Sequence, residues 1–438
     1  MEIEKWRDKN FRSKNYSHFD ERININDSFF NYIKDPEKIK KHSFFPLIYK
    51  EQIFLKYDKN EIGNFKRKVR PLAYSSHKDR AIFSYYSFLL NKAYNDYCKK
   101  KGIDNSSIAY RTNLKKSNID FAKEAFDFIK KLESGYIIIG DFKSFFDNLQ
   151  HEVLKKNLCE VLKQNKLNED WYAIYKNITK YSKCDIKELL LINGLNESEI
   201  EKLNDMPRVV TLEQFNELRK NGKIQNNKEK KESPEESSKG IPQGTPISAV
   251  FSNVYMINFD QELKEYVKQK NGLYLRYSDD FIIVIPDNKI NIDEIKKYIY
   301  NLCSGEEKLT LEPNKTREYK YIKNKISEIS SGKQIRIDYL GFTFDGEKIR
   351  IRDKTLTKYY YRMYKKIKTI KNARKKNEKV SCQNLYRHYS IKGIKDKKKN
   401  FISYVIKAEK IFENLEDEIK KVRLTHLKKI KNRLKIKI

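Results

Sequence analysis

The residues with the clearest capacity for chemistry are two adjacent aspartates, Asp279 and Asp280, which follow Ser278 between two apolar runs. The runs, residues 273–277 and 281–285, are rich in β-branched and aromatic residues, a pattern that predicts two strands joined by a tight turn. A carboxylate near buried strands is costly to desolvate without a cation, and hard divalent cations prefer oxygen ligands. The hairpin therefore predicts a metal site, although acidic residues are also common in exposed turns.

A third aspartate, Asp141, ends the short β-branched run Tyr136–Asp141, which predicts a buried strand with an acid at its carboxyl end. If this strand neighbours the hairpin, the three carboxylates converge. Two metal ions held by such a cluster can clamp the attacking oxygen and the leaving phosphate of nucleotidyl transfer. The residue types therefore indicate metal-assisted phosphoryl chemistry.

The charge of the chain favours a polyanionic partner. Lys and Arg number 93 and Asp and Glu 60, which gives a net charge of +33. From Asp353 to the end the counts are 28 and 8, so this last fifth carries more than half of the surplus. A coding bias toward Lys, Ile and Asn would enrich lysine without unbalancing the charge. Nucleic acid is the simplest partner for such a protein.

Composition also limits the setting in which the protein works. The five cysteines show no paired spacing, so neither a zinc motif nor a disulfide framework is expected. The N-terminus lacks the apolar core of a signal peptide, and no apolar run is long enough to span a membrane. We expect a reducing, cytoplasmic location and no membrane partner.

Periodicity places further elements around the aspartates. Residues 1–60 are expected to be mostly helical, and residues 64–74 fit a strand pair. Within residues 163–239, helix starts are predicted at Asn196 or Ser198 and at Thr211, the latter with a capping-box sequence. Other expected helices cover residues 79–97, 151–162, about 247–265, 292–302 and from 357 onward; other expected strands cover 309–311, 336–344 and 348–352.

Five motifs, taken in order, resemble the successive palm motifs of reverse transcriptases. Each is weak or moderately specific alone, but their shared order makes the resemblance specific, and it extends from about Lys66 to Phe344. The motifs are Asp141–Phe146, Gly240–Ser248, Tyr277–Asp280, Leu309–Lys315 and Tyr339–Phe342.

This resemblance implies an α+β right-hand polymerase fold, with an antiparallel palm sheet backed by helices and a basic α-helical thumb. The implied domains are an N-terminal helical extension (1–60), fingers (61–135), a palm (136–344) with an inserted segment at about 163–239, and a thumb or C-terminal RNA-binding region (345–438).

The resemblance also implies a role for individual residues. Asp141, Asp279 and Asp280, with the backbone carbonyl of Phe142, would hold two Mg²⁺ ions, or Mn²⁺ in their place. Lys315 would meet the pyrophosphate as a charge partner or proton donor. Phe146 would lie under the sugar and exclude a 2′-hydroxyl, which favours dNTPs. The remaining assignments are Arg70, Arg80, Lys68, Gln243 and Gly244 for the nucleotide, with Gly244 allowing close backbone approach, and Arg111, Tyr277, Tyr339, Leu340 and Gly341 for template and primer.

Plainer interpretations stay open for the residues other than the aspartates. Phe146 could be ordinary core, Tyr339–Phe342 an ordinary hairpin, and the basic residues a solvated surface.

Weaker motifs indicate a subgroup. The chain lacks a recognisable RNase H domain, a His/Cys endonuclease cluster and the Val-Thr-Gly signature of retron enzymes. Residues 106–111 and a tail with residues 388–393 and 400–404 resemble bacterial reverse transcriptases of the "unknown groups", many of which act in anti-phage defence. The resemblance implies a non-coding RNA as template or scaffold, dNTPs as substrates and a cDNA product, and it allows a homo-oligomer. In the tail, Tyr359, Tyr360, Tyr361 and Tyr364 could stack on unpaired bases.

Three rival functions remain. A retron- or group II intron-type reverse transcriptase would share the chemistry and use a different RNA. An RNA-templated RNA polymerase is disfavoured by Phe146. A non-catalytic RNA-binding scaffold is disfavoured because all three carboxylates are present.

Overall fold

The structure, a computed structural model, describes residues 2–57, 65–227, 238–287, 291–376, 378–395, 399–412 and 417–434. Its central element is a five-stranded antiparallel sheet in the order β6-β7-β3-β8-β9. Its strands are β6 (Leu273–Tyr277), β7 (Asp280–Pro286), β3 (Ser134–Asp141), β8 (Arg317–Ile322) and β9 (Lys325–Glu328). The predicted hairpin and the predicted strand before Asp141 are confirmed, whereas β8 and β9 were not predicted.

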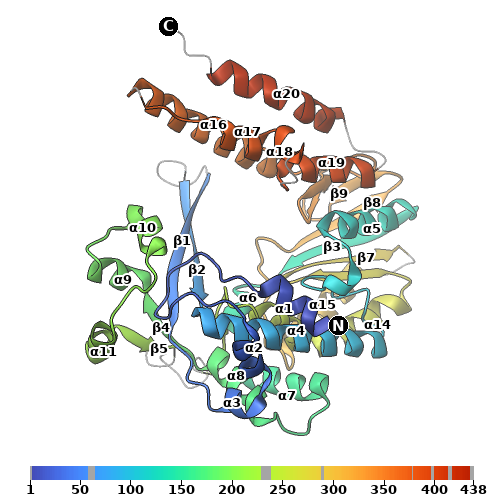
Figure 1. The fold of residues 1–438 in the computed structure, drawn as a ribbon. Helices are drawn as coiled ribbons and strands as arrows, with labels where there is room; N and C mark the ends of the chain where they lie inside the picture. The colour runs from blue at the N-terminus through green and yellow to red at the C-terminus, as the bar shows by residue number, and fades with distance from the viewer. Residues whose placement is uncertain are drawn as a thin grey trace.

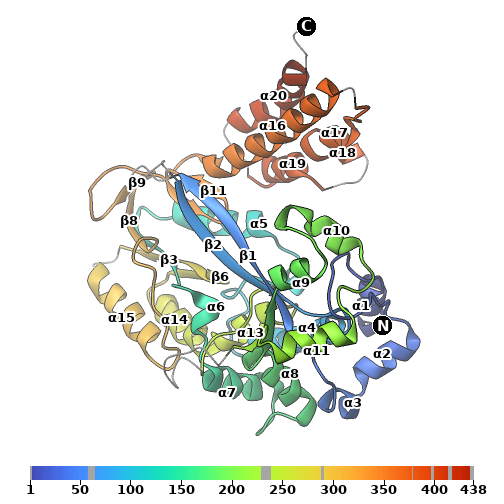
Figure 2. The same cartoon turned by 90° about the vertical axis from the view of Figure 1, so that its left-hand side faces the viewer.

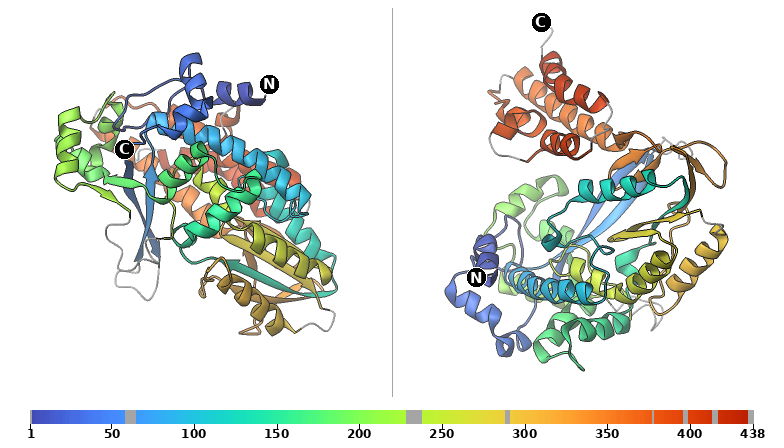
Figure 3. Two further views of the ribbon diagram at one scale, coloured as in Figure 1. Left: turned by 90° about the horizontal axis from the view of Figure 1, so that it is seen from below. Right: turned by 90° about the vertical axis from the view of Figure 1, so that its right-hand side faces the viewer.

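Both faces of this sheet are buried, which explains why the sequences of its central strands are continuous apolar runs. Ile138 and Ile283 belong to one core, with residues of α14 (Ile257–Gln269) and α15 (Ile292–Ser304). Ile137 and Ile282 belong to a second core, with residues of α5 (Asn118–Lys130). Figure 3 shows the sheet between these two layers of helices.

A second sheet, in the order β2-β1-β4-β5, lies beside the first (Figure 1). Strands β1 (Leu47–Tyr57) and β2 (Phe65–Tyr74) pair antiparallel along their whole lengths. The expectation of mostly helix in residues 1–60 is therefore wrong beyond α3. The helices of that region are α1 (Glu2–Asn10), α2 (Asp27–Lys34) and α3 (Pro36–Lys40).

The segment predicted as an insertion supplies the other two strands of this sheet. Strand β4 (Ser182–Asp185) runs parallel to β1, and β5 (Ile224–Asn226) pairs with β4. Both predicted helix starts are confirmed: Asn196 caps a short 3₁₀ turn before α10, and Thr211 forms a capping box with Gln214. The sequence of residues 228–239, which is charged and contains Pro and Ser, predicts a loop. Most of it lies outside the described residues, since 228–237 are not among them. The helices here are α8 (Glu169–Thr179), α9 (Ile186–Ile192), α10 (Ile200–Asp205) and α11 (Leu212–Lys220).

Two further helices follow the predicted periodicity, and one predicted helix is divided in two. Helix α4 (His77–Lys100) and α7 (His151–Leu162) cover the predicted ranges. The single helix expected from residue 247 is instead α13 (Ser248–Tyr255) followed by α14, with a turn at Met256. A short helix, α6 (Phe145–Asn148), follows β3.

The C-terminal part begins with a small antiparallel sheet and ends in helices, as Figures 1 and 2 show. The ammonium of Lys358 on α16 lies 5.8 Å from the centre of the Phe54 ring on β1, so the first turns of α16 contact β1. In the described ranges no helix is long and apolar enough to cross a membrane. The elements are β10 (Ile337–Tyr339), β11 (Phe342–Phe344), β12 (Ile349–Ile351), α16 (Asp353–Lys375), α17 (Gln383–Tyr389), α18 (Lys392–Lys395), α19 (Phe401–Ile411) and α20 (Asp417–Leu434).

Candidate active site

The register of β3 and β7 brings the predicted carboxylates together. Asp141 at the end of β3 lies directly opposite Asp280 at the start of β7, and Asp279 precedes Asp280 in the turn. The backbone amide of Phe142 donates to the carbonyl oxygen of Asp279 at 3.2 Å, which ties the two chain segments together beyond the last strand pair. The predicted convergence of the aspartates required their strands to be neighbours. Strands β3 and β7 are neighbours in the sheet.

The turn before Asp279 is held by a buried ion pair. Ser278 adopts a left-handed conformation with φ of 63°, and its carbonyl oxygen accepts a hydrogen bond of 3.0 Å from the guanidinium of Arg276. That guanidinium is fully buried and donates to both carboxylate oxygens of Asp260 on α14, at 2.8 and 2.6 Å. The hydroxyl of Tyr274 donates to the same carboxylate at 2.7 Å. The turn is therefore anchored to a core helix.

The sequence analysis missed Arg276 and Asp260. The available signal was a charged residue in the middle of an otherwise apolar strand. Because an unpaired buried charge is so costly, Arg276 required a buried acidic partner.

The three aspartates create a concentration of negative charge. Burial, and then the charge of Asp141, raise the pKa of Asp279. Burial, followed by the charges of Asp279 and Asp141, raise the pKa of Asp280, although its side chain keeps a path to solvent. Asp141 itself forms an ion pair with the ammonium of Lys315. Carboxylates with raised pKa values are poised to bind a cation, because a cation relieves their mutual repulsion.

The donor set fits hard divalent cations. All three side chains offer oxygen ligands, and they come from the facing ends of two adjacent strands. Among the described residues, no three side chains of His, Cys, Asp or Glu already stand in a metal-ligand arrangement, and the cation paired with Asp141 is that of Lys315. The contact places the Lys315 ammonium beside the Asp141 carboxylate, whereas its expected role at the pyrophosphate stays a prediction.

The turn-dense segment after Gly240 packs against the segment that follows Asp141. The amide of Ile241 donates to the carbonyl oxygen of Phe146 at 2.9 Å, so the predicted nucleotide-binding loop and Phe146 are neighbours. The Phe146 side chain is half-buried and its ring lies edge-on to Phe145. Phe146 is thus partly packed and partly exposed, and its role under the sugar stays a prediction beside that of an ordinary core residue.

The structure gives a reason for glycine at position 244 that differs from the one expected. Its φ is 123°, and a Cβ atom there would lie 2.6 Å from the carbonyl oxygen of Ala73 on β2. The carbonyl oxygen of Gln243 accepts a hydrogen bond of 2.7 Å from the Ala73 amide. The close backbone approach at Gly244 is therefore made to strand β2, and it joins this loop to the second sheet.

The expected triphosphate contacts lie on or near that strand. Lys68 and Arg70 are exposed residues of β2 whose side chains share one face, because they are two residues apart. The Arg70 guanidinium lies 5.8 Å from the centre of the Phe54 ring. Arg80, in the first turn of α4, is half-buried.

Arg111 does not occupy the position expected of a template contact. Its side chain has no exposed surface and forms an ion pair with Asp104. It also donates to the side chain of Asn95 at 2.8 Å and to the carbonyl oxygens of Asp104 and Ser107 at 2.6 and 2.9 Å. The expectation that Arg111 holds template or nucleotide is therefore corrected: the residue fixes the loop in which it lies. Sequence alone could not separate a buried arginine from an exposed one in this motif.

The predicted primer contacts lie beside the hairpin and α5. Tyr277 is half-buried at the end of β6. Tyr339 is buried, its hydroxyl has no hydrogen-bond partner among the described residues, and burial and the charge of Asp280 raise its pKa. Leu340 and Gly341 form a turn with φ of 45° and 94°, and the carbonyl oxygen of Leu340 accepts from Asn118 at 2.9 Å.

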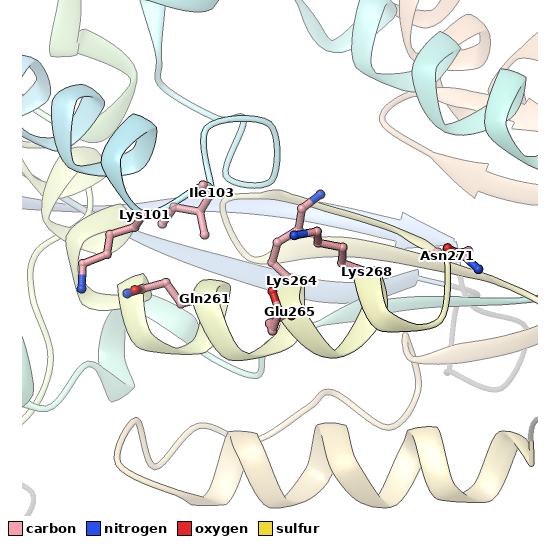
Figure 4. A pocket seen from close by; sticks show the side chains of 9 residues that line it. Lys101, Ile103, Gln261, Lys264, Glu265, Lys268 and Asn271 are labelled. Atoms are coloured by element: carbon pink, nitrogen blue, oxygen red, sulfur yellow. The ribbon is translucent and has the colours of Figure 1, made fainter.

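A separate pocket lies between the C-terminal end of α4 and α14 (Figure 4). None of the predicted site residues lines it, so it is distinct from the carboxylate cluster. Its polar lining includes Lys101, Gln261, Lys264, Glu265, Lys268 and Asn271.

Comparison with known proteins decides the family. A family model described as "Reverse transcriptase (RNA-dependent DNA polymerase)" matches residues 56–344, about two thirds of the chain. The chain belongs to the reverse transcriptase family. Its mixed α+β architecture with antiparallel sheets is the right-hand polymerase fold that the motifs implied.

More distant similarities are also found. Protein YkfC of Escherichia coli (strain K12) is 28% identical over an alignment that covers 18% of this chain and 29% of that protein. Apo telomerase from Candida tropicalis, truncated from its C-terminal domain, has a TM-score of 0.41 and 14% identity, over 76% of this chain and 61% of that one. Telomerase from Candida albicans in complex with a TWJ fragment of telomeric RNA has the same TM-score and identity, over 93% of this chain and 68% of that one. This chain thus spans less than a third of YkfC.

Proposed function

We propose that this member of the reverse transcriptase family is an RNA-directed DNA polymerase whose catalytic carboxylates are Asp141, Asp279 and Asp280. The observation that carries the proposal is the register of β3 and β7, which sets Asp141 opposite Asp280 and next to Asp279. The raised pKa values of Asp279 and Asp280 support it, because they reflect a cluster of negative charge that a cation would stabilise.

The three carboxylates and the backbone carbonyl of Phe142 are the groups that would hold two Mg²⁺ ions, or Mn²⁺ in their place. When bound, such ions would activate the 3′-hydroxyl of the primer and neutralise the charge of the leaving pyrophosphate. Lys315 already reaches the Asp141 carboxylate. Its ammonium is therefore within reach of a phosphate group bound beside Asp141, to which it would supply positive charge or a proton.

Other residues would select and orient the nucleotide. Phe146 lies against the loop at Ile241, and its aromatic ring would exclude a 2′-hydroxyl and favour dNTPs. Gln243 would contact the nucleotide from the same loop. Arg70 and Lys68 on β2, with Arg80 on α4, would contact the triphosphate.

We propose a domain assignment on the same basis. The five-stranded sheet and its helices are the palm, the β1–β2 hairpin is the core of the fingers, and the helices from α16 onward are the thumb. Within the segment 163–239, β4 and β5 belong to the sheet of the fingers, because β4 pairs with β1 and β5 pairs with β4. The approach of Lys358 to Phe54 connects fingers and thumb on one side of the molecule.

The helical C-terminal part offers a surface for RNA. A groove between α16 and α20 has a volume of about 950 Å³ and is lined by Tyr361, Lys365, Lys368, Lys371 and Arg433 among others. Of the four tyrosines expected to stack on bases, Tyr359 is buried, whereas Tyr361 is 65% exposed. We therefore assign the stacking role to Tyr361, with the surrounding lysines on phosphates.

Two tyrosines of the four are covered by cations of α20. Lys429 lies 3.9 Å from the centre of the Tyr360 ring and Arg433 lies 3.7 Å from that of Tyr364. These contacts join α16 to α20 and stabilise the packing of the two helices that form the groove.

We further propose that the template is a non-coding RNA and that the cDNA serves bacterial anti-phage defence. The support is the resemblance of residues 106–111 and of the basic tail to the "unknown group" enzymes.

The experiment that tests the proposal is dNTP incorporation by protein purified with its native RNA, followed by sequencing of the product. The comparison is with Asp279→Ala/Asp280→Ala. DNA made only by the wild type, with a sequence complementary to the bound RNA, is the expected result. DNA from the double variant would refute the catalytic assignment. RNA binding without DNA synthesis by the wild type would favour the scaffold function instead.

A further inference from the structure

Tyr110 has a backbone conformation that its side chain disfavours. Its φ is 61°, in the left-handed region that glycine adopts without strain and other residues adopt only when their surroundings require it. The residue is not a buried one whose packing would explain the strain, since it is 44% exposed. A large aromatic side chain on a strained backbone and in solvent is a combination that calls for a functional explanation.

Neighbouring contacts impose this conformation. The side chain of Asn253 on α13 donates to the carbonyl oxygen of Ala109 at 2.9 Å, and that of Asn91 on α4 donates to the carbonyl oxygen of Tyr110 itself at 3.0 Å. The next residue, Arg111, is the buried arginine that fixes the loop. The backbone on both sides of Tyr110 is thus fastened to the core, and the fastening determines where the ring points.

The ring points to the turn that carries the aspartates. The hydroxyl of Tyr110 donates to the hydroxyl oxygen of Ser278 at 3.2 Å, and Ser278 immediately precedes Asp279. The centre of the Tyr110 ring lies 6.4 Å from that of Tyr277, with the planes inclined at 45°. Two tyrosines therefore flank the turn: Tyr277 is half-buried, and Tyr110 is the more exposed of the two.

We infer that Tyr110 is a nucleic-acid contact whose ring stacks on a base of the primer–template at the carboxylate turn. The inference rests on the proposed function. Stacking on an aromatic ring stabilises any base, because every base has a π-face, so it suits an enzyme that copies varied sequences. The loop that Arg111 fixes would then serve to present the preceding residue to the nucleic acid.

The first test is equilibrium binding of a fluorescent RNA template–DNA primer by the full chain, in EDTA so that no chemistry occurs. Tyr110→Leu and Tyr110→Gly are expected to weaken binding by about tenfold, the effect of losing one stacked base. Tyr110→Phe keeps the ring and loses the bond to Ser278, and it is expected to bind within about twofold of the wild type. Tyr300→Leu, which removes an exposed tyrosine of α15, is the matched control and should bind like the wild type.

Thermal stability separates stacking from a structural role. Glycine accepts the positive φ, so Tyr110→Gly is expected to keep the wild-type melting temperature while losing affinity. Wild-type affinity in Tyr110→Gly would overturn the inference, as would a loss in Tyr110→Phe equal to that in Tyr110→Leu.

A second measurement identifies the stacked base. With 2-aminopurine placed in turn at the primer 3′ end and at the first unpaired template position, Tyr110→Leu should change the fluorescence at one of the two. No change at either would overturn the stacking. If Tyr110 contributes to tight binding but the wild type incorporates no dNTP, the proposed function alone is refuted. If the wild type incorporates dNTPs and Tyr110→Gly binds primer–template with wild-type affinity, this inference alone is refuted.

Discussion

At the scale of single residues, the position of the aspartates depends on a buried ion pair that takes no part in the chemistry. Arg276 and Asp260 are both fully buried, and their pairing holds the carbonyl oxygen of Ser278. Removing one partner of such a pair leaves an uncompensated charge in the core, which is far more costly than losing a surface pair.

We expect Arg276→Ala to lower the free energy of unfolding by about 3–5 kcal/mol. Arg317→Ala, which breaks a more exposed pair with Glu328, should cost at most about 1 kcal/mol. Denaturant titration of both variants checks the difference. The double variant Arg276→Met/Asp260→Leu should recover part of the loss; if it is less stable than Arg276→Ala, the buried-charge explanation is wrong.

Glu307 gives a pH-dependent prediction at the same scale. Burial raises its pKa to about 7, so the folded state binds a proton that the unfolded state releases near pH 4–5. The folded protein therefore loses stability as the pH rises from about 4.5 to 7, and the penalty stays constant above that range. Glu307→Gln removes the penalty, and it is expected to stabilise the protein at pH 8 by about 1–3 kcal/mol and to have little effect at pH 5.

The measurement is the unfolding midpoint of each protein at the two pH values. Glu306→Gln, next to it and exposed, is the control and should change the midpoint little at either pH. An equal effect of Glu307→Gln at both pH values would show that its carboxyl is not protonated in the folded state.

Residue types and spacing predicted the carboxylates but not the residues that hold them in position. Asp141, Asp279 and Asp280 stand at strand ends, where a carboxylate is unusual enough to be noticed. Arg111 was assigned wrongly because a basic residue in a motif carries no sign of its burial. Tyr110 was passed over because a positive φ leaves no trace in the sequence when the residue is not glycine.

At the scale of elements, the decisive pairings join segments far apart in the chain. Strand β1 pairs with β4, although more than a hundred residues separate them. Local periodicity predicts that a strand exists but not which strand it pairs with, so the segment 163–239 was taken for an insertion. Helices α4 and α7, whose contacts repeat every three or four residues, were predicted to within three residues at each end.

Gly244 tests one junction between elements. We expect Gly244→Ala to destabilise the protein by about 2–4 kcal/mol, because a Cβ atom would both clash with Ala73 and occupy a strained φ. Gly222→Ala is the control, since Gly222 has a positive φ of 66° and open space around it, and it should cost only about 1 kcal/mol. Equal losses of unfolding free energy would mean that contact with β2 is not what requires glycine at position 244.

At the scale of the whole molecule, the net charge of +33 is the dominant property. Each phosphate that a lysine neutralises releases counterions, so affinity for RNA falls with salt in proportion to the number of contacts. The basic groove of α16 and α20 gives this charge a location, which composition could indicate only as a basic C-terminal region.

We expect RNA affinity to fall steeply with salt concentration. Lys368→Ala/Lys371→Ala, in the groove, should reduce the slope of log K against log [salt] by about 1.5. Lys99→Ala/Lys100→Ala, exposed at the end of α4, removes the same charge elsewhere and should leave the slope within error. Equal slopes for the two variants would show that net charge, and not the groove, determines binding.

The most direct test of the account is single-turnover addition of one dNMP to a DNA primer on a defined RNA template. Asp141→Asn and Asp280→Asn are compared with Asp287→Asn, which changes an aspartate just past the other end of β7 that pairs with Lys320. We predict extension by the wild type and by Asp287→Asn, and a rate at least about a thousandfold lower in Asp141→Asn and Asp280→Asn, with template binding retained. Extension by Asp280→Asn at the wild-type rate would contradict the assignment of the paired ends of β3 and β7 as the catalytic centre.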